Sequence, residues 1–259
     1  MKNIEHITDL CVIGGGMAGI CTAISAARHG IKVVLVQDRG VLGGNASSEI
    51  RMWICGAHGK DNRETGIIEE IMLENFFQNP QLSYSLWDMV LFDKTARQDN
   101  LTLLLNTSCL DANTENGKII SITAWQSPCE TVHTIKARYF ADCSGDSILS
   151  TLTGAHFRYG REAESEFGES IEPKTADKKT MGMSCLFQVR ETDKPQKFTP
   201  PEWAYKYCTD DDIPFREHDL SSNFWWIETG GEGDCIHDTD KCRDELLKIG
   251  YGVWDHIKN

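Results

Sequence analysis

The sequence has few basic residues and no long apolar run. Lys and Arg number 26 against 39 Asp and Glu, which gives a formal net charge of −13 over 259 residues. A surface that neutralises a nucleic-acid backbone or an anionic membrane carries the opposite sign of charge. No stretch approaches the roughly 18 consecutive apolar residues of a membrane-spanning helix. We therefore expect neither nucleic acid nor a membrane as a partner.

Cysteines at metal-binding spacing and a secretory leader are also missing. The ten cysteines include no C-x-x-C pair, and the two nearest in sequence, Cys235 and Cys242, are seven positions apart. This spacing supports neither a zinc site nor an iron–sulfur cluster. The amino-terminal residues contain no apolar leader segment and no small-residue cleavage site. We expect reduced thiols and a cytoplasmic protein.

The first forty residues have the pattern of a βαβ unit. A short apolar strand over 9–13 leads into the G-x-G-x-x-G segment 14–19. Apolar residues then recur at helical spacing as far as Ala27, Gly30 ends the helix, and residues 31–36 form a second strand. This context is the one in which such a glycine segment binds a dinucleotide, and the alternative is a glycine-rich turn without a ligand.

Each glycine of this segment has its own physical task. Gly14 permits the tight turn, Gly16 lets a pyrophosphate approach the backbone, and Gly19 lets the helix pack on the sheet. The helix N-terminus presents unpaired N–H groups and the positive end of its dipole to that pyrophosphate. The expected contacts are Gly14, Gly15, Gly16, Met17, Ala18 and Gly19.

The end of the second strand is expected to bind a ribose. An acidic residue is typical there, about 20 residues after the glycines, but this chain has Gln37, followed by Asp38 and Arg39. The Gln37 amide can bond a ribose hydroxyl without charge assistance, and Asp38 is the substitute. Arg39 indicates either a 2′-phosphate, and hence NADP, or a solvated side chain.

A second glycine pair lies a few residues beyond this strand. Gly43, Gly44 and Asn45 follow a dinucleotide-type βαβ unit, and this order resembles the N-terminus of the two-dinucleotide-binding flavoproteins. Residues 41–47 are similar to the FAD-dependent oxidoreductase family that includes the flavin portion of heterodisulfide reductase A. The resemblance covers most of the chain, more weakly after about residue 160. It implies FAD as cofactor, with its central section near these three residues.

The remaining pattern predicts the fold. Helices are expected over 67–79 and from Ser85, strands over 101–105 and 132–140, and a hairpin at Asn116-Gly117. These elements predict an α/β fold with a doubly wound parallel sheet, Rossmann-like, and an inserted antiparallel β-meander at about 101–140. We expect an FAD-binding domain over 1–155 and a partial α+β substrate domain over 156–259.

Two further cofactor contacts are implied by the resemblance. Backbone near Cys109 corresponds to the place where the family meets the adenine. The polar turn after residue 143 is similar to the family's T-G-D-G motif, which implies contacts from Gly145 and Asp146. Ser144 and Ser147 depart from that motif. The alternative for Asp146 is a helix N-cap.

Candidate catalytic residues follow the second glycine pair. Arg51 is a candidate to anchor a substrate carboxylate or to stabilise a reduced, anionic flavin, and otherwise is a surface residue. His58 is a candidate proton donor because its reference pKa lies near neutrality. The alternative for His58 is a structural loop residue.

The expected function is oxidation or reduction of a small organic substrate through FAD, with NAD(P) as a further electron donor or acceptor. One alternative is an electron-transfer protein like heterodisulfide reductase A with iron–sulfur partners, and another is a non-catalytic FAD- or NAD-binding module. A homo-oligomer or an electron-transfer partner is also expected. Residues 246–254 lead to Asn259 without an obvious closing element, so we expect truncation at the C-terminus. Whether the 259 residues alone complete the FAD pocket is left open by the sequence.

Overall fold

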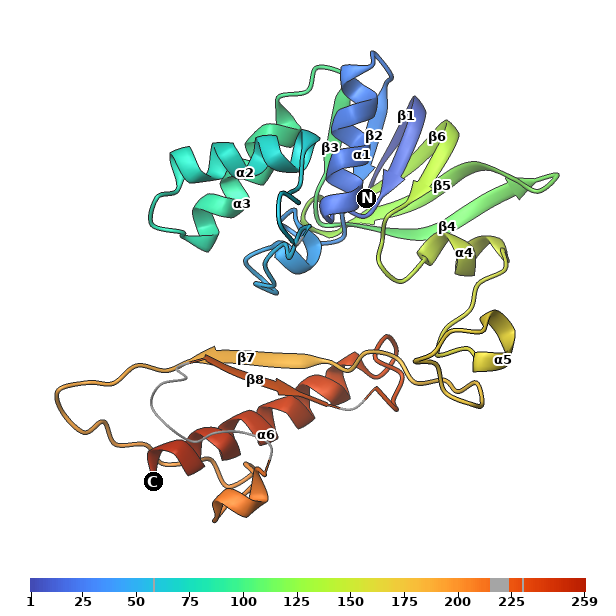
Figure 1. The fold of residues 1–259 in the computed structure, drawn as a ribbon. Coiled ribbons are helices and arrows are strands. Elements are labelled where there is room, and N and C mark those ends of the chain that lie inside the picture. The colour runs from blue at the N-terminus through green and yellow to red at the C-terminus, as the bar shows by residue number, and fades with distance from the viewer. Residues whose placement is uncertain (58, 215–223, 230) are drawn as a thin grey trace. The chain divides into compact units, whose positions relative to one another are not determined.

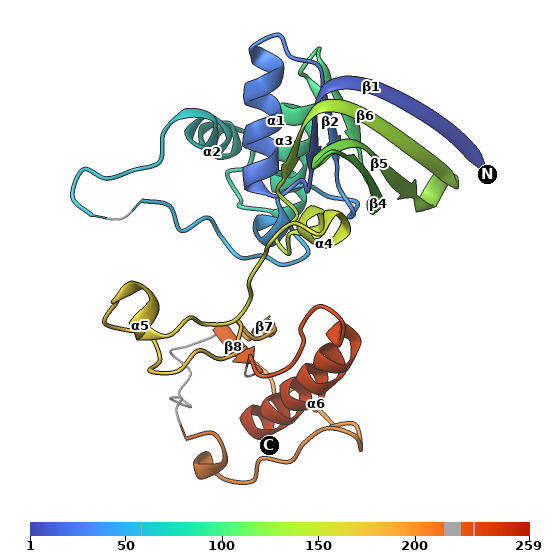
Figure 2. The ribbon, with the colours of Figure 1, turned by 90° about the vertical axis from the view of Figure 1, so that its right-hand side faces the viewer.

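A computed structural model describes residues 1–57, 59–214, 224–229 and 231–259 of the chain. Contacts between residues divide it into two compact units, 1–157 and 158–259 (Figures 1 and 2). Within the described ranges, no helix combines the length and apolar character needed to cross a membrane.

The first unit is built on one six-stranded sheet in the order β3-β2-β1-β6-β5-β4. Four strands, β3, β2, β1 and β6, are parallel, whereas β5 and β4 continue the sheet antiparallel. The strands are β1 (Lys2–Ile13), β2 (Val33–Val36), β3 (Leu101–Leu104), β4 (Thr107–Glu115), β5 (Lys118–Gln126) and β6 (Thr131–Asp142).

The predicted βαβ unit is confirmed. Helix α1 (Met17–Arg28) connects β1 to β2, and Leu10 pairs with Val33 while Ile13 pairs with Val36. This parallel register brings the carboxyl ends of β1 and β2 to the same edge of the sheet. Strand β1 is longer than the predicted 9–13, because residues 2–8 pair with the first half of β6.

One face of the sheet is covered by three helices: α1, α2 (Gly66–Gln78) and α3 (Tyr84–Ala96) (Figure 1). Their apolar side chains form one core cluster with those of β1 and β2. Its members with no exposed surface are Val12, Ile20, Ala23, Ile24, Leu35, Ile71 and Leu91. Helix α3 begins one residue before the predicted start and α2 one residue before its own, within the usual uncertainty of a sequence-based boundary.

The opposite face of the sheet is covered by the antiparallel strands and by α4 (Ile148–Thr153). Ile122 and Ala124 of β5 and Leu149 of α4 pack against Ile13 and Val36. The sheet therefore folds back over itself beyond β6. The mixed α/β fold with a mostly parallel sheet and an inserted antiparallel segment is thus confirmed.

The predicted hairpin is also present. Strand β4 ends at Glu115 and β5 begins at Lys118, and Asn116 and Gly117 between them both have positive φ, 51° and 74°. Two central residues with positive φ match the twist of antiparallel strands, which is why Asn-Gly is so strong a hairpin signal. Short 3₁₀ turns lie at Gly44–Ala46 and, after β5, at Ser127–Cys129.

A charged network joins the helices across their surface. The ammonium of Lys94, a residue only 7% exposed, lies 2.9 Å from Glu70 and 3.1 Å from Glu74. Glu70 also accepts two hydrogen bonds from Arg28 of α1. The Arg28 hydrogen bond, followed by that of Lys94, lowers the pKa of Glu70 to about 2. The carboxylate is therefore ionised at neutral pH and links all three helices.

The second unit pairs two antiparallel strands, β7 (Ser184–Gln188) and β8 (Phe224–Glu228). The unit also contains the short α5 (Glu164–Phe167) and a 3₁₀ turn at Asp210–Asp212. The assignment of this unit to substrate binding stays a prediction.

A long helix, α6 (Thr239–Lys258), occupies the segment for which we expected no closing element. Its buried Leu246 and Val253 pack with Ile227 of β8. Gly250 and Gly252 interrupt the apolar pattern of this segment, so the sequence did not predict the helix. A Cβ on Gly252 would lie 2.4 Å from the Tyr205 carbonyl oxygen, so the glycine permits close packing of the chain on this helix.

Two histidines bridge the long strands β1 and β6. Nε2 of His6 lies 2.9 Å from Nδ1 of the 2% exposed His133, whose Nε2 lies 3.1 Å from Oε1 of Gln126. The Gln126 amide nitrogen donates to the Leu105 carbonyl, which fixes Oε1 as the acceptor for His133. Nε2 of His133 therefore donates to Oε1 of Gln126. Burial lowers the pKa of His6, and burial, then His6 and Lys2, lowers that of His133.

This pair predicts a loss of stability in mild acid. Unfolded histidines bind protons below about pH 6.5, whereas the folded pair resists them, so the unfolding free energy falls as pH decreases from that value. The stabilisation is fully present above it. Chemical denaturation between pH 7 and pH 5 is expected to give a flatter profile for His133→Gln than for the parent chain. His29→Gln, at an exposed position, is the control, and equal slopes for parent and His133→Gln would contradict the prediction.

Candidate cofactor-binding site

Four loops meet at the carboxyl edge of the parallel strands. The N–H of Gly14 donates to the carbonyl of Val36 at 2.8 Å, and that of Cys143 donates to Ile13 at 2.7 Å. The N–H of Thr107 donates to the carbonyl of Gln37 at 2.8 Å. The turns after β1, β2, β3 and β6 are therefore tied together, at the place where open α/β sheets bind their ligands.

Two of the three motif glycines are required by the fold itself. Gly14 has a φ of +99°, and a Cβ there would lie 2.2 Å from the Cys143 carbonyl oxygen. A Cβ on Gly19 would lie 1.8 Å from the carbonyl oxygen of Gly14. Any side chain at either position would therefore displace α1 or the turn after β6.

Gly16 differs from both. Its φ is −67°, which every residue adopts readily, and a Cβ there would meet nothing nearer than the Gly44 Cα at 3.9 Å. The protein's own packing therefore does not demand a glycine, and the missing side chain leaves the backbone open to a ligand. A dinucleotide pyrophosphate fits this opening.

The helix that begins here is uncapped. Gly16 is the N-cap of α1, no side chain caps the first turn, and no acidic residue lies in it. Met17 is half-buried against the core and Ala18 is exposed. The first-turn N–H groups of α1 thus combine a positive dipole end with an open approach, which suits a phosphate anion.

The side chain of Gln37, an expected ribose contact, is engaged inside the protein. Gln37 is only 3% exposed. Its Oε1 accepts a hydrogen bond from the Gly15 N–H at 2.6 Å, and its Nε2 donates one to the Val41 carbonyl at 3.1 Å. Both polar groups of the amide are thus engaged inside the protein. Gln37 holds the glycine turn against the loop after β2, and a carboxylate would lack the donor that Val41 needs.

The two residues after Gln37 are exposed. Arg39 forms an ion pair with Glu49 at 2.9 Å, so its guanidinium is engaged within the loop. A 2′-phosphate contact by Arg39 stays a prediction. Asp38 is exposed at the end of β2, where a ribose-binding carboxylate is typical. Among the expected ribose contacts, Asp38 is therefore the one whose side chain suits the task.

The second glycine pair lies directly beside the first. The N–H of Gly43 donates to the Gly15 carbonyl at 2.8 Å, and Gly43 forms an isolated parallel bridge with Gly16. Gly43 and Gly44 have φ values of +109° and +57°, which favour glycine. Asn45 follows and is exposed. The structure thus brings together the two segments that the sequence linked to one cofactor.

Side chains from α3 support this second loop, a role that the sequence analysis missed. Nε1 of Trp87 donates to the Ala46 carbonyl at 2.7 Å, and Asp88 accepts from the Ser48 N–H at 3.0 Å. Both residues were interpreted only as part of a helix start. No local pattern indicates such contacts, because the partners are about forty positions apart.

The turn after β6 contains the third expected motif. Asp142 accepts from the Leu149 N–H at 2.8 Å, and Ser144 Oγ accepts from the Ile148 N–H at 3.1 Å. These two residues satisfy the start of α4, which was the alternative role considered for Asp146. Gly145 has a φ of +87°, a Cβ there would meet no atom within 4 Å, and Asp146 is exposed.

Cys109 lies inside the antiparallel ladder. Its backbone pairs with Ala124, and burial raises the pKa of its thiol to about 11. Asn106 and Thr107 contact the loop after β2 instead, and the Asn106 N–H donates to the Arg39 carbonyl at 3.0 Å. A backbone contact with adenine near Cys109 stays a prediction.

Of the two catalytic candidates, the structure describes Arg51. His58 lies outside the described residues. Arg51 has a φ of +62°, donates from Nε to the Ser48 carbonyl at 2.9 Å, and lies over the Tyr84 ring, 5.0 Å from its centroid. Its exposed guanidinium is therefore oriented by the loop and by α3.

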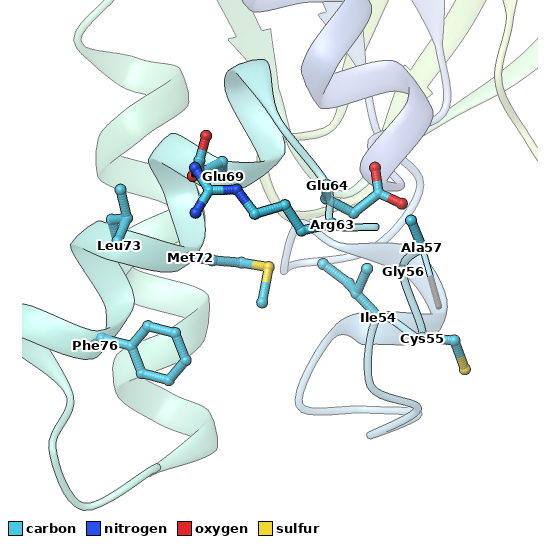
Figure 3. A pocket seen from close by; sticks show the side chains of 10 residues that line it. All are labelled: Ile54, Cys55, Gly56, Ala57, Arg63, Glu64, Glu69, Met72, Leu73 and Phe76. Atoms are coloured by element: carbon cyan, nitrogen blue, oxygen red, sulfur yellow. Dashed lines mark ion pairs between the residues drawn. The ribbon is translucent and has the colours of Figure 1, made fainter. Parts of the chain in front are cut away.

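A pocket of about 270 Å³ lies between the segments 54–57 and 63–64 and helix α2 (Figure 3). Ile54, Met72 and Phe76 point into it, and an ion pair between Arg63 and Glu69, 2.6 Å long, lies at its rim. None of the glycines of the two loops lines it.

The glycine geometry predicts opposite outcomes for two alanine variants. Gly19→Ala is expected to lower the unfolding free energy by about 2 kcal/mol or more, because its methyl group overlaps the Gly14 carbonyl. Gly16→Ala is expected to change it by less than about 1 kcal/mol. Denaturant unfolding of the ligand-free chain measures both, and equal losses for the two variants would contradict this interpretation of the turn.

Comparison with known proteins extends these observations. Residues 9–238 match the model of the family described as FAD dependent oxidoreductase. Glycerol-3-phosphate dehydrogenase of Mycobacterium leprae is 36% identical over 66 residues, 26% of this chain and 11% of the relative. Mitochondrial dihydrolipoyl dehydrogenase of Schizosaccharomyces pombe is 56% identical over 36 residues, 14% of this chain and 7% of the relative. The matched stretches therefore span only about a tenth of the relatives' length.

Solved structures show weaker similarity. A flavin-dependent brominase aligns with 73% of this chain and 48% of its own, with a TM-score of 0.47 and 14% identity. L-proline dehydrogenase from P. horikoshii aligns with 56% of this chain and 24% of its own, with a TM-score of 0.36 and 17% identity.

Proposed function

Because the chain belongs to the FAD-dependent oxidoreductase family, we propose that its glycine loops bind FAD and that the protein oxidises or reduces a small organic substrate. The observation that carries the proposal is made at Gly16. The protein's own packing does not require a glycine there, and the missing side chain leaves the backbone open to a ligand. It lies at the uncapped start of α1 and beside the second glycine pair.

In this proposal, each part of the site has one task. The N–H groups of Gly16, Met17 and Ala18 hold the pyrophosphate at the N-terminus of α1. The carboxylate of Asp38 accepts a hydrogen bond from a ribose hydroxyl. Gly43, Gly44 and Asn45 receive the central section of FAD, and Gly145 and Asp146 approach it from the turn after β6. Gln37, Trp87 and Asp88 hold these loops in position.

Flavin, when bound, supplies hydride or electron transfer to the substrate. The protein's contribution is placement and electrostatics. The guanidinium of Arg51 is exposed, and its bond to Ser48 orients it, so a substrate carboxylate is its proposed partner. His58 is retained as a proposed proton donor.

Two further parts of the proposal are the electron donor or acceptor and the cellular compartment. NAD(P) is the proposed electron donor or acceptor, and the cytoplasm is the proposed compartment. The purified chain is expected to take up FAD and to show a flavin spectrum that NADH or NADPH bleaches. A brown absorption tail would instead favour an electron-transfer protein with iron–sulfur partners. A protein that takes up no FAD would overturn the proposal.

We expect Gly16→Ala to weaken FAD binding at least about tenfold, a loss of about 1.4 kcal/mol, because the methyl group occupies the approach to the pyrophosphate. Isothermal titration with FAD measures the change. Ser25→Ala, at an exposed position of the same helix, is the matched control. Undiminished affinity in Gly16→Ala would show that no phosphate approaches this backbone.

A second variant tests the ribose contact. Asp38→Asn is expected to weaken FAD binding about three- to tenfold, since a neutral amide replaces a charge-assisted hydrogen bond. Asp99→Asn, at an exposed position before β3, is expected to bind as the parent does. Equal affinity of Asp38→Asn and the parent chain would remove Asp38 from the site.

A further inference from the structure

Helix α2 carries apolar side chains on two of its sides. Ile71 has no exposed surface and packs in the core cluster of the first unit. Met72, Leu73 and Phe76 lie roughly 100–200° around the helix from Ile71, at about 3.6 residues per turn. Leu73 and Phe76 are 61% and 60% exposed. A helix that is apolar on both sides normally buries both, so we expect an apolar group to pack against the outer side of α2.

The segment 54–57 forms the opposite wall of the pocket on this outer side. Figure 3 shows Ile54 and Met72 pointing toward each other across the space. The N–H of Met52 donates to the Asn45 carbonyl at 2.8 Å, which anchors the chain two residues before this wall begins. The pocket therefore lies between a helix and a loop whose start is tied to the second glycine loop.

The turn within this wall depends on Gly56. Its φ is +70°, a conformation that favours glycine, and a Cβ there would lie 3.3 Å from Cγ of Glu64. The two segments that line the pocket opposite α2, 54–57 and 63–64, therefore pack closely against each other. The wall is formed by the protein's own backbone and packing, as is usual for small-molecule sites.

The charges at the pocket do not call for a charged ligand. Nη2 of Arg63 lies 2.6 Å from Oε1 of Glu69, and the Arg63 side chain is 75% exposed. This pair neutralises its own charges at the solvent side of the pocket. Glu64 adds a negative charge to the lining, which disfavours a carboxylate in the pocket. The other lining residues carry no charge and most are apolar, so the group that fits is uncharged.

The pocket has room for a substituted ring. Its volume is about 270 Å³, whereas an engineered protein cavity of about 150 Å³ lined by Leu, Ile and Phe already binds benzene. Met72 has a flexible, polarisable side chain, which makes favourable contacts with aromatic rings. The size and the lining suit an aromatic ring with short substituents, or a branched aliphatic group.

We propose that this pocket is a binding site for an uncharged aromatic or branched aliphatic group of a small organic molecule. Apolar contacts with Ile54, Met72 and Phe76 hold the group, and the Arg63–Glu69 pair stays in water at the opening. The glycines of the two proposed FAD loops do not line the pocket, so the site is separate from the contacts assigned to the cofactor. The inference does not depend on FAD, and its failure leaves the proposed flavin function untouched.

The test uses p-cresol, a phenol that is uncharged at neutral pH, as the probe. The full, folded chain is isotopically labelled at the methionine methyl carbons for NMR, and Met72→Leu identifies the Met72 signal. We expect p-cresol to shift this signal with a dissociation constant of about 1 mM or below, and to leave the signal of the exposed Met181 unchanged. The polyol myo-inositol, similar in size but polar, is expected to shift neither signal. An unchanged Met72 signal in the presence of p-cresol would overturn the proposal.

Two neighbouring phenylalanines of α2 provide matched variants. Phe76 lines the pocket, whereas Phe77, 86% exposed, does not. Phe76→Ala is expected to weaken p-cresol binding at least about threefold, because apolar contact surface is lost, and Phe77→Ala is expected to bind as the parent chain does. Equal losses in the two variants would reveal adsorption to exposed apolar side chains and would overturn the proposal. A dimer in sedimentation that excludes p-cresol would also overturn it, because a second copy would then fill the pocket.

Discussion

The close approach of α1 to the turn after β1 is the constraint on which the first unit depends. Gly19 lies against the carbonyl of Gly14, and Gly14 lies against the backbone of Cys143. Any side chain at these two glycines would separate the helix from the sheet edge. The same contact places the uncapped N-terminus of α1 over the ends of β1 and β6. Folding and the shape of the proposed FAD site therefore have one common cause.

Around that contact the protein supports its loops from within. Gln37 bonds both the first glycine turn and the loop after β2, and Trp87 and Asp88 hold the loop that follows the second glycine pair. These bonds engage buried or half-buried polar groups inside the protein and leave Gly16 and Asp38 facing outwards. A site whose backbone is oriented before the ligand arrives loses less entropy on binding.

The parts of the fold that rest on local rules could be predicted from the sequence. The βαβ unit shows helical spacing of apolar residues between two apolar strands, with glycines at the turns. Asn116-Gly117 specifies its hairpin turn through the backbone conformation of these two residues alone. The features that were missed depend on distant partners. Gln37 was assigned to a ribose from its position at the end of the second strand. Its bonds to Gly15 and Val41 could not be predicted, because they exist only in the fold. The guanidinium of Arg39 forms an ion pair with Glu49. Helix α6 was not predicted because two glycines interrupt its apolar pattern, and one of them, Gly252, packs against Tyr205.

Amide hydrogen exchange of the chain with and without FAD tests the proposed cofactor site most directly. If FAD lies across the carboxyl edge of the sheet, protection increases in three segments, 15–19, 38–45 and 144–147, and does not change at the β4–β5 turn around Asn116. Protection confined to other parts of the chain, or none in the segment 15–19, would contradict the proposed cofactor site.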